Sequence, residues 1–321
     1  MRRSERPGAA LRWWRDDRGA VVLEARPATA APPPLVPGVD VLAKRRLGPA
    51  FWVAVGWLVV VVGLAALAPW LPFIDDPGEL DPSALREGPT AAHWFGGDDG
   101  GRDVFARVVW GGRVSLFIGV LSVAAGMAVG GFIGLTAGYF RGRYERIVMS
   151  SMDVMLAFPA LVLALALVTF LSTPGSQGGS IFTVTLALSV LAVPALARIT
   201  RAATLTFAQR EFVTAARALG ATHRRIILRE ILPNVVPPMA SFSLLAIAIV
   251  IVAEGALSFL GLSVQAPQPT WGNLIAQGRP QLDIAPHIAL FPCGVMFVTL
   301  LSLNLVGDRL REFFDVKEIR L

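Results

Sequence analysis

Residues that could carry chemistry are sparse in this sequence, and Glu254 is the most informative of them. It stands inside an apolar stretch, residues 239–262, where an ionisable side chain is costly and marks a functional site by default. The carboxylate could line a translocation path. It could equally accept hydrogen bonds from nearby backbone or hydroxyl groups, or face a partner subunit. The sequence alone leaves these alternatives open.

No other pattern of polar residues predicts catalysis or a metal site. Cys293 is the single cysteine, and His93, His223 and His287 are far apart, so the chain has no Cys/His metal spacing. The acidic, glycine-rich run at residues 98–103 fails the calcium-loop spacing. The chain also lacks the Gly-x-x-x-x-Gly-Lys-Ser/Thr motif of a P-loop. We therefore predict no catalytic residue, no metal ligand and no cofactor bound by this chain, and its energy source must be another chain or an ion gradient.

Long apolar blocks must position these residues. Of the 321 residues, 54% are hydrophobic and 16% are charged, with a mean hydropathy of +0.60. The apolar residues gather in blocks of about 18–25 residues, the length that crosses ~30 Å of hydrocarbon as helix. Pro159, Pro194 and Pro292 fall inside these blocks and predict kinks. The sequence thus predicts an all-α integral membrane protein with six spans, at residues 51–70, 114–139, 154–171, 181–199, 239–262 and 288–306.

Positively charged residues are concentrated in alternate loops between these spans. The segments before the first span, between the second and third, between the fourth and fifth, and after the sixth are rich in Arg. The loop at residues 71–113 instead has eight acidic residues against four Arg, and residues 172–180 have no charge. Because Lys and Arg favour the cytoplasmic side of a membrane, we predict that both termini are cytoplasmic. Basic residues at span ends fit anionic lipid better than nucleic acid.

Composition and orientation together divide the chain. Residues 1–48 are rich in Arg, Pro and Ala and cannot bury much surface, so we predict a disordered cytoplasmic arm. The arm is too long for the n-region of a signal peptide, and we expect no cleavage at the first span. The first span and an external loop follow at residues 49–113, then a core domain at 114–310 and a cytoplasmic tail at 311–321.

A stripe of glycines occupies one face of the second predicted span. Gly126, Gly130, Gly134 and Gly138 recur at every fourth position. Small residues at this spacing let another helix backbone approach closely in a membrane. Glycine is also enriched in membrane helices generally, but a stripe of this length favours tight packing against a neighbouring span. It predicts no chemistry.

The loop between the fourth and fifth spans, residues 211–234, has a helical pattern of its own. Phe212, Ala215, Ala216 and Leu219 fall on one helical face, and Gly220 is a typical helix stop. A second basic and apolar helical stretch follows and ends at Pro233. Small side chains would let such a helix enter a cleft of another protein. The alternative is a basic helix lying on the lipid surface.

This loop resembles the EAA loop of binding-protein-dependent ABC importer permeases. Glu211 matches the acidic residue at the start of the wider pattern, and Thr214 stands where the motif usually has glutamate. The resemblance therefore implies coupling through the alanine face and Gly220 and not through a carboxylate at position 214. The residues that it assigns to ATPase coupling are Glu211, Phe212, Ala215, Ala216, Leu219, Gly220, Ile226, Leu232 and Pro233.

Three further stretches resemble one subgroup, the peptide/nickel permeases of the dipeptide and oligopeptide C-subunit type. They lie at residues 93–107, 254–273 and 304–311, and the whole resemblance covers residues 51–315. Within the first stretch, Gly97 replaces a usual threonine. The order of all four stretches along the chain makes the resemblance specific.

The resemblance implies a type I ABC importer permease fold in the bacterial plasma (inner) membrane, with residues 114–310 as its core. It implies a second permease subunit in a heterodimer, two ABC ATPase subunits that carry ATP-Mg, and an extracytoplasmic substrate-binding protein. Peptides are the expected substrate, with nickel, glutathione, opines or sugars left open. The alternatives are an ion-coupled secondary transporter or channel, or a membrane enzyme; inverted repeats or a nucleophile–base pair would mark them, and neither pattern is present.

Overall fold

The computed structural model of the protein describes residues 12–15, 21–24, 48–172 and 179–318. The chain forms two compact units, Met1–Arg46 and Leu47–Leu321.

The first unit contains a short β-hairpin. Strand β1 (Arg12–Arg15) pairs antiparallel with β2 (Val21–Glu24), and Arg12 lies opposite Glu24. The prediction of a disordered arm does not hold for these two strands. Their tryptophans and valines are residues that favour pleated strands, and a prediction based on the overall composition of the arm did not take that local preference into account. The rest of the predicted arm, apart from Gly48, lies outside the described residues.

The described part of the second unit is built from helices that turns and loops connect. Short 3₁₀ turns at Ala68–Trp70, Pro82–Ala84 and Arg279–Gln281 extend or connect the helices. The helices are α1 (Pro49–Leu67), α2 (Val104–Phe140), α3 (Gly142–Ala157), α4 (Ala160–Leu171), α5 (Ile181–Phe207), α6 (Glu211–Ala218), α7 (His223–Arg225), α8 (Leu232–Phe259), α9 (Trp271–Gly278) and α10 (His287–Glu318).

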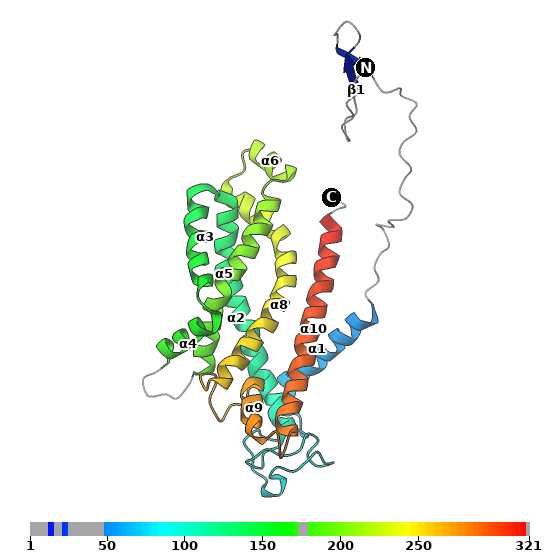
Figure 1. The fold of residues 1–321 in the computed structure, drawn as a ribbon, viewed down its shortest axis with the longest axis vertical. Coiled ribbons are helices and arrows are strands. Elements are labelled where there is room, and N and C mark those ends of the chain that lie inside the picture. Colours follow the sequence, from blue (N-terminus) through cyan, green and yellow to red (C-terminus); the bar gives the residue numbers. More distant parts are fainter. Residues whose placement is uncertain (1–11, 16–20, 25–47, 173–178, 319–321) are drawn as a thin grey trace. The chain divides into compact units, whose positions relative to one another are not determined.

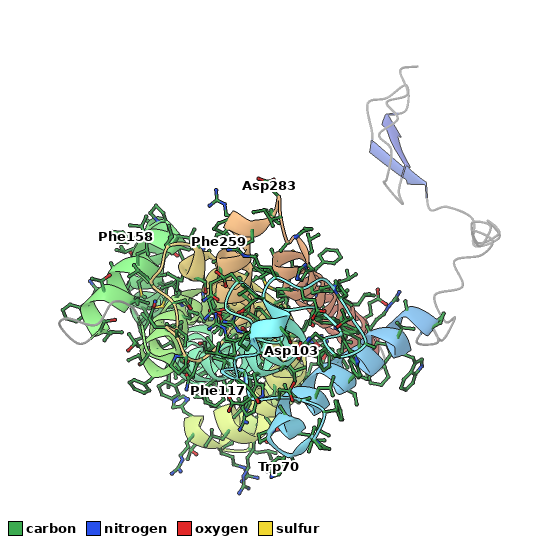
Figure 2. The ribbon with its side chains drawn as sticks, turned by 90° about the horizontal axis from the view of Figure 1, so that it is seen from below. Trp70, Asp103, Phe117, Phe158, Phe259 and Asp283 are labelled. Carbon is green, nitrogen blue, oxygen red and sulfur yellow. The ribbon has the colours of Figure 1, made fainter. Side chains whose placement is uncertain are left out.

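Most of the predicted spans are present as long apolar helices. Five stretches in the described residues are long and apolar enough to cross a membrane, and large apolar side chains cover the outside of the unit, with Trp70 and Phe158 at its rim in the end-on view of Figure 2. Pro194 and Pro292 lie inside continuous helices. The five stretches are Pro49–Trp70, Val104–Phe140, Ile181–Phe207, His223–Phe259 and His287–Phe314.

The third predicted span, residues 154–171, is not one straight helix. Helices α3 and α4 meet at an angle of 92°. Phe158 has ψ 137° and Pro159 has ψ 122°, so two successive residues are extended. The residue before a proline avoids the helical region because the proline ring clashes with it. The sequence predicts a kink at Pro159, whereas the structure has a complete break there.

Helices α2 and α5 run parallel and in close contact. A Cβ added to Gly126 would lie 2.8 Å from the Cβ of Ala192, and one added to Gly138 would lie 2.8 Å from the Cβ of Thr204. Residue numbers therefore increase in the same direction along both helices. The segment that connects the end of α2 to the start of α5 must return the chain to the opposite end of the unit. The bent α3–α4 pair makes that return, and the number of spans reaches the predicted six when the pair is taken as one span.

The glycine stripe of α2 faces α5. Added Cβ atoms on Gly130 and Gly134 would clash with the carbonyl oxygens of Val193 and Ala197. Nearer the start of α2 the packing is also close, because a Cβ on Gly112 would lie 2.9 Å from the indole of Trp271. Helix α2 is thus the central helix of the unit, in contact with α5, α8 and α9.

The second unit has two distinct ends. Helix α6 lies at one end, and α9 lies at the other, together with the loop between α1 and α2 (Figure 1). We call these the α6 end and the α9 end. One hydrophobic core cluster includes the fully buried side chains of Trp271, Ile118, Leu188 and Ile251, and a separate cluster lies beneath α6.

Candidate functional site

Helix α6 ends in two backbone hydrogen bonds that reverse the chain. The amide of Gly220 donates to the carbonyl of Arg217, and the amide of Ala221 donates to that of Ala216, each at 3.0 Å. This pair of bonds is a Schellman motif, in which the first of the two donor residues takes the left-handed conformation. Gly220 has φ +78°, a conformation that costs other L-residues about 1–2 kcal/mol. The helix stop predicted at Gly220 is confirmed.

A second helical stretch continues from this turn into α8 without a break. The hydroxyl of Thr222 accepts the amide of Arg225 and caps α7. A π-helical turn follows at Ile226–Ile231, where the amide of Leu232 donates to Ile227, five residues back. The prediction that this stretch ends at Pro233 is wrong, because Pro233 lies in the first turn of α8. Because α7, the π-helical turn and α8 are continuous, Pro233 lies within the helical stretch, directly after the turn in which the backbone pairing departs from the α-helical pattern.

Helix α6 has a buried face and an exposed apolar face. Val213 is fully buried and Ala216 is half-buried, in a cluster that includes Ile226. On the exposed face, Leu219 is 88% exposed and Phe212 39% exposed. Large apolar side chains that are exposed outside the membrane-spanning helices indicate an interaction surface.

The predicted ATPase-coupling residues divide between these two faces and the turn beyond. Ala215, Glu211, Gly220 and Pro233 are exposed. Ile226, only 1% exposed, belongs to the core beneath α6 and supports the helix from below, while Leu232 is half-buried.

Contacts among three side chains join residues 211–234 to the last turn of α2. The hydroxyl of Tyr139 lies 2.7 Å from Nδ1 of His223. The guanidinium of Arg217 lies over the Tyr139 ring, 5.4 Å from its centroid, which is a cation–π contact. Tyr139 itself is 7% exposed. Sequence reasoning singled out neither Tyr139 nor Val213. Val213 is one position from the predicted apolar face, but the pattern carries no signal for Tyr139.

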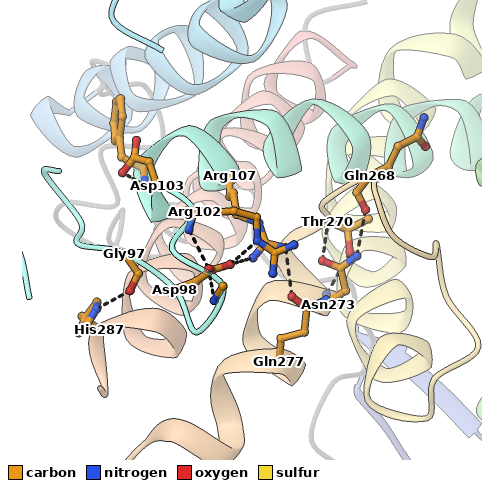
Figure 3. Close-up of polar contacts among 12 residues, drawn as sticks. Gly97, Asp98, Arg102, Asp103, Arg107, Gln268, Thr270, Asn273, Gln277 and His287 are labelled. Atoms are coloured by element: carbon orange, nitrogen blue, oxygen red, sulfur yellow. Dashed lines mark hydrogen bonds and ion pairs between the residues drawn. The ribbon is translucent and has the colours of Figure 1, made fainter. Parts of the chain in front are cut away.

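A buried ion pair organises the α9 end. Arg107, in the second turn of α2, pairs with Asp98, and both side chains are almost fully buried. Asp98 also accepts the amides of Gly100 and Arg102 at 2.7 and 2.9 Å, and Nε of Arg102 at 2.9 Å. Arg107 donates in addition to Oε1 of Gln277 in α9 at 3.1 Å (Figure 3). The glycine-rich turn is thus a docking point for α2 and α9. Sequence reasoning missed Arg107, whose signal is an arginine close to the start of a long apolar helix.

The neighbouring carboxylates shape the same loop. Asp103 caps α2 by accepting the amides of Phe105 and Ala106 at 3.2 and 3.0 Å. Burial raises the pKa of the Asp103 carboxyl, although both amide bonds oppose that shift. Further along the loop, hydrogen bonds from the Ser83 hydroxyl and amide lower the pKa of Asp81. Local capping therefore orders the loop before α2.

Glu254 lies in the last turns of α8 and ties them to the loop that leads into α9. Its Oε1 accepts hydroxyl donors from Ser258 at 3.0 Å, Ser263 at 2.6 Å and Thr270 at 2.9 Å. Its side chain is fully buried in the single chain, and Oε2 faces Gly272 of α9, whose added Cβ would lie 3.1 Å away. Within this chain the carboxylate holds α8 and α9 together, and it lies at the opposite end from α6.

The chain matches known proteins over most of its length. The profile of the binding-protein-dependent transport system inner membrane component family matches residues 130–319. The glutathione transport system permease protein GsiD of Pectobacterium atrosepticum is 40% identical over 268 residues, 83% of this chain and 87% of that protein. The protein of the same name from Escherichia coli is 38% identical over 261 residues, 81% of this chain and 84% of its own length.

A solved structure supports the same fold. The chain is similar to a chain of the MetNI methionine ABC transporter in an inward-facing conformation, with a TM-score of 0.55 and 18% sequence identity. The alignment covers 66% of this chain and 96% of the other. Because the family profile spans more than half of the sequence and the relatives exceed a third in identity, the chain belongs to the binding-protein-dependent transport system inner membrane component family and is a permease subunit of an ABC importer.

Proposed function

We propose that residues 211–234, called here the α6 segment, are the surface through which a separate ATPase drives this permease. The observation that carries the proposal is the exposed apolar face of α6. Leu219 is 88% exposed and Phe212 39% exposed, while Ala215 between them adds little bulk. A burial of this face against a partner would remove apolar surface from water, which is the main driving force of association.

The orientation that fits this role puts the α6 end in the cytoplasm and the α9 end outside. The α6 segment contains Arg217, Arg224, Arg225 and Arg229, and the turn between α2 and α3 adds further arginines at the same end. Arginine and lysine favour the cytoplasmic side. With six crossings, both termini would then be cytoplasmic. The acidic loop at residues 71–103 would face outwards and meet the binding protein.

The assembly in which this chain would act has several subunits. We infer a second permease subunit in a heterodimer, two ATPase subunits at the α6 end, and the binding protein at the α9 end. ATP-Mg would be held by the ATPase subunits, and this chain would bind no cofactor. The absence of a P-loop motif from the sequence supports that division of labour.

The substrate class that we propose is short peptides, with glutathione as the first compound to test. Support comes from the relatives named as glutathione transport permeases, which match this chain over more than four fifths of its length. The binding protein would set most of the selectivity, and the permease would provide half of the path.

The experiment compares two leucines at opposite ends. Leu219→Asp puts a charge on the exposed face of α6, and Leu80→Asp makes the same change in the loop before α2, where Leu80 is 65% exposed. Both proteins are expressed with the neighbouring transporter subunits, purified in detergent and reconstituted in proteoliposomes. We expect Leu219→Asp to lose most of the co-purifying ATPase and at least tenfold in ATP-dependent uptake of glutathione, because a buried unpaired charge weakens an interface by several kcal/mol.

Leu80→Asp should keep the ATPase bound, because the residue lies at the other end of the molecule. Normal co-purification of the ATPase with the Leu219→Asp protein would show that α6 is not the contact surface. A loss of ATPase from both variants would indicate a general folding defect and would also remove support for the proposal.

A further inference from the structure

The α6 segment reaches α2 through side chains alone. Tyr139 and His223, whose hydroxyl and Nδ1 lie 2.7 Å apart, are separated by 84 positions in the sequence. Leu135 and Tyr139 of α2 also share an apolar cluster with Val213 and Ile226. Apolar contacts of this kind are non-directional. The hydrogen bond, by contrast, fixes one atom of α2 relative to one atom of the α6 segment.

The surroundings of this bond keep it in place. The Tyr139 ring has Phe140 at its edge, with centroids 5.1 Å apart, and Phe140 in turn contacts the His223 ring at 5.9 Å. Arg217 covers the Tyr139 ring at 5.4 Å. Since Tyr139 is only 7% exposed, its hydroxyl is held where water competes weakly, which strengthens a hydrogen bond.

Helix α2 cannot move far without α5. An added Cβ on Gly138, the residue before Tyr139, would lie 2.8 Å from the Cβ of Thr204, and one on Gly134 would lie 2.8 Å from the amide nitrogen of Arg201. The two backbones are therefore packed with no gap along the last turns before Tyr139. Arg201 also forms an ion pair with Glu145 of α3, so a displacement of the end of α2 would move α5 and α3 with it.

We propose that Tyr139 and His223 form the link that passes a displacement of the α6 segment to the paired helices α2 and α5. Both are positioning residues. The idea rests on the proposed function of α6 as the ATPase contact. It adds that the signal enters the membrane part through α2 and α5, in addition to the continuous helix that joins α7 to α8.

The chain offers a matched control, because it has two tyrosines. The hydroxyl of Tyr144 lies 3.0 Å from Oγ1 of Thr136, a contact between α3 and α2 that does not involve the α6 segment. Tyr139→Phe and Tyr144→Phe remove the same atom from neighbouring places. On the other side of the link, His223→Asn keeps a polar group near the position of Nδ1, and His223→Leu removes it.

The readout is the stimulation of ATP hydrolysis by the binding protein, measured on the complete transporter in proteoliposomes. It reports communication between the α9 end and the ATPase, and it can be followed with and without glutathione as the added probe. We expect Tyr139→Phe and His223→Leu each to lower the stimulation about two- to tenfold, the range that the loss of one hydrogen bond gives. Tyr144→Phe and His223→Asn should stay close to the unmodified protein, and the Tyr139→Phe/His223→Leu double variant should be no worse than either single variant.

Three results would overturn the link. These are unchanged stimulation in Tyr139→Phe, additive losses in the double variant, or a loss of bound ATPase that shows a merely structural role. The Leu219→Asp protein separates this failure from that of the proposed function. If Leu219→Asp releases the ATPase while Tyr139→Phe leaves stimulation intact, only the link is wrong. If the Leu219→Asp protein retains the ATPase, the proposed role of α6 as the ATPase contact is wrong, and the link that rests on it loses its basis.

Discussion

Arg107 in α2 and Asp98 in the loop before it form a buried ion pair. The two partners differ in the number of further hydrogen bonds that they make. Asp98 accepts three further hydrogen bonds, from the amides of Gly100 and Arg102 and from Nε of Arg102. Arg107 has one other hydrogen bond in the described residues, to Gln277. The loss of each partner therefore has a different consequence.

We predict that Asp98→Ala destabilises the protein more than Arg107→Met does. Asp98→Ala leaves a buried guanidinium without its counter-charge and removes the acceptor of two amides, a change that costs about 3–5 kcal/mol. Arg107→Met leaves Asp98 with its other donors, and the methionine stem fills much of the space. Thermal unfolding of the detergent-solubilised protein measures the difference, with the exposed Asp99→Ala as the control. Equal melting temperatures for Asp98→Ala and Asp99→Ala would contradict the prediction.

The glycines of α2 provide a second comparison, between Gly134→Ala and Gly131→Ala. A Cβ at Gly134 would clash with the carbonyl of Ala197 in α5, whereas the nearest atom to a Cβ at Gly131 is Sδ of Met127 at 3.5 Å. Gly134→Ala must therefore push the two backbones apart, and overpacking of this kind costs about 1–3 kcal/mol. Gly131→Ala should be neutral or slightly stabilising, since alanine favours helix by roughly 1 kcal/mol over glycine.

Thermal unfolding again measures both glycine variants. A Gly134→Ala protein as stable as the Gly131→Ala protein would show that α2 and α5 are not in direct backbone contact. That result would also weaken the argument that these helices move together.

Glu254 allows a structural role to be separated from a role in the translocation path. Glu254→Gln keeps a carbonyl oxygen for the hydroxyls of Ser263 and Thr270, while Glu254→Leu removes it and leaves buried donors unpaired, at about 1–3 kcal/mol for each group. We predict that Glu254→Gln retains both its melting temperature and glutathione uptake, and that Glu254→Leu loses both. An uptake defect in Glu254→Gln with a normal melting temperature would instead favour a place for the carboxylate on the path.

The broad architecture was readable from the sequence because it depends on composition and length. Backbone polar groups in hydrocarbon must be paired within a helix, so each long apolar block had to be helical. The helix stop at Gly220 could also be predicted from the sequence, because the left-handed φ at this position is a local backbone conformation that favours glycine. The glycine stripe from Gly126 to Gly138 predicted close packing against another helix, although the sequence did not identify that helix as α5.

Other features depended on contacts between distant residues. Pro159 predicted a kink, but the complete break and the angle of 92° between α3 and α4 were seen only in the structure. Pro233 was expected to end a helix, and the π-helical turn before it placed it inside the first turn of α8. The contacts of Asp98 with Arg107 and of Tyr139 with His223 could not be predicted, because no periodic pattern in the sequence indicates them.

Thus the sequence by itself determined the membrane-spanning helical class, the family and the location of the α6 segment. These follow from local properties, namely hydrophobic length, charge and turn chemistry, which each stretch of chain carries on its own. Only the tertiary structure decided which face of α6 is free and that Glu254 joins α8 to the α9 region. It alone showed that the α6 segment is hydrogen-bonded to α2 through His223 and Tyr139. Side-chain pairing across long sequence separations depends on how whole helices pack, and packing is a property of the assembled fold.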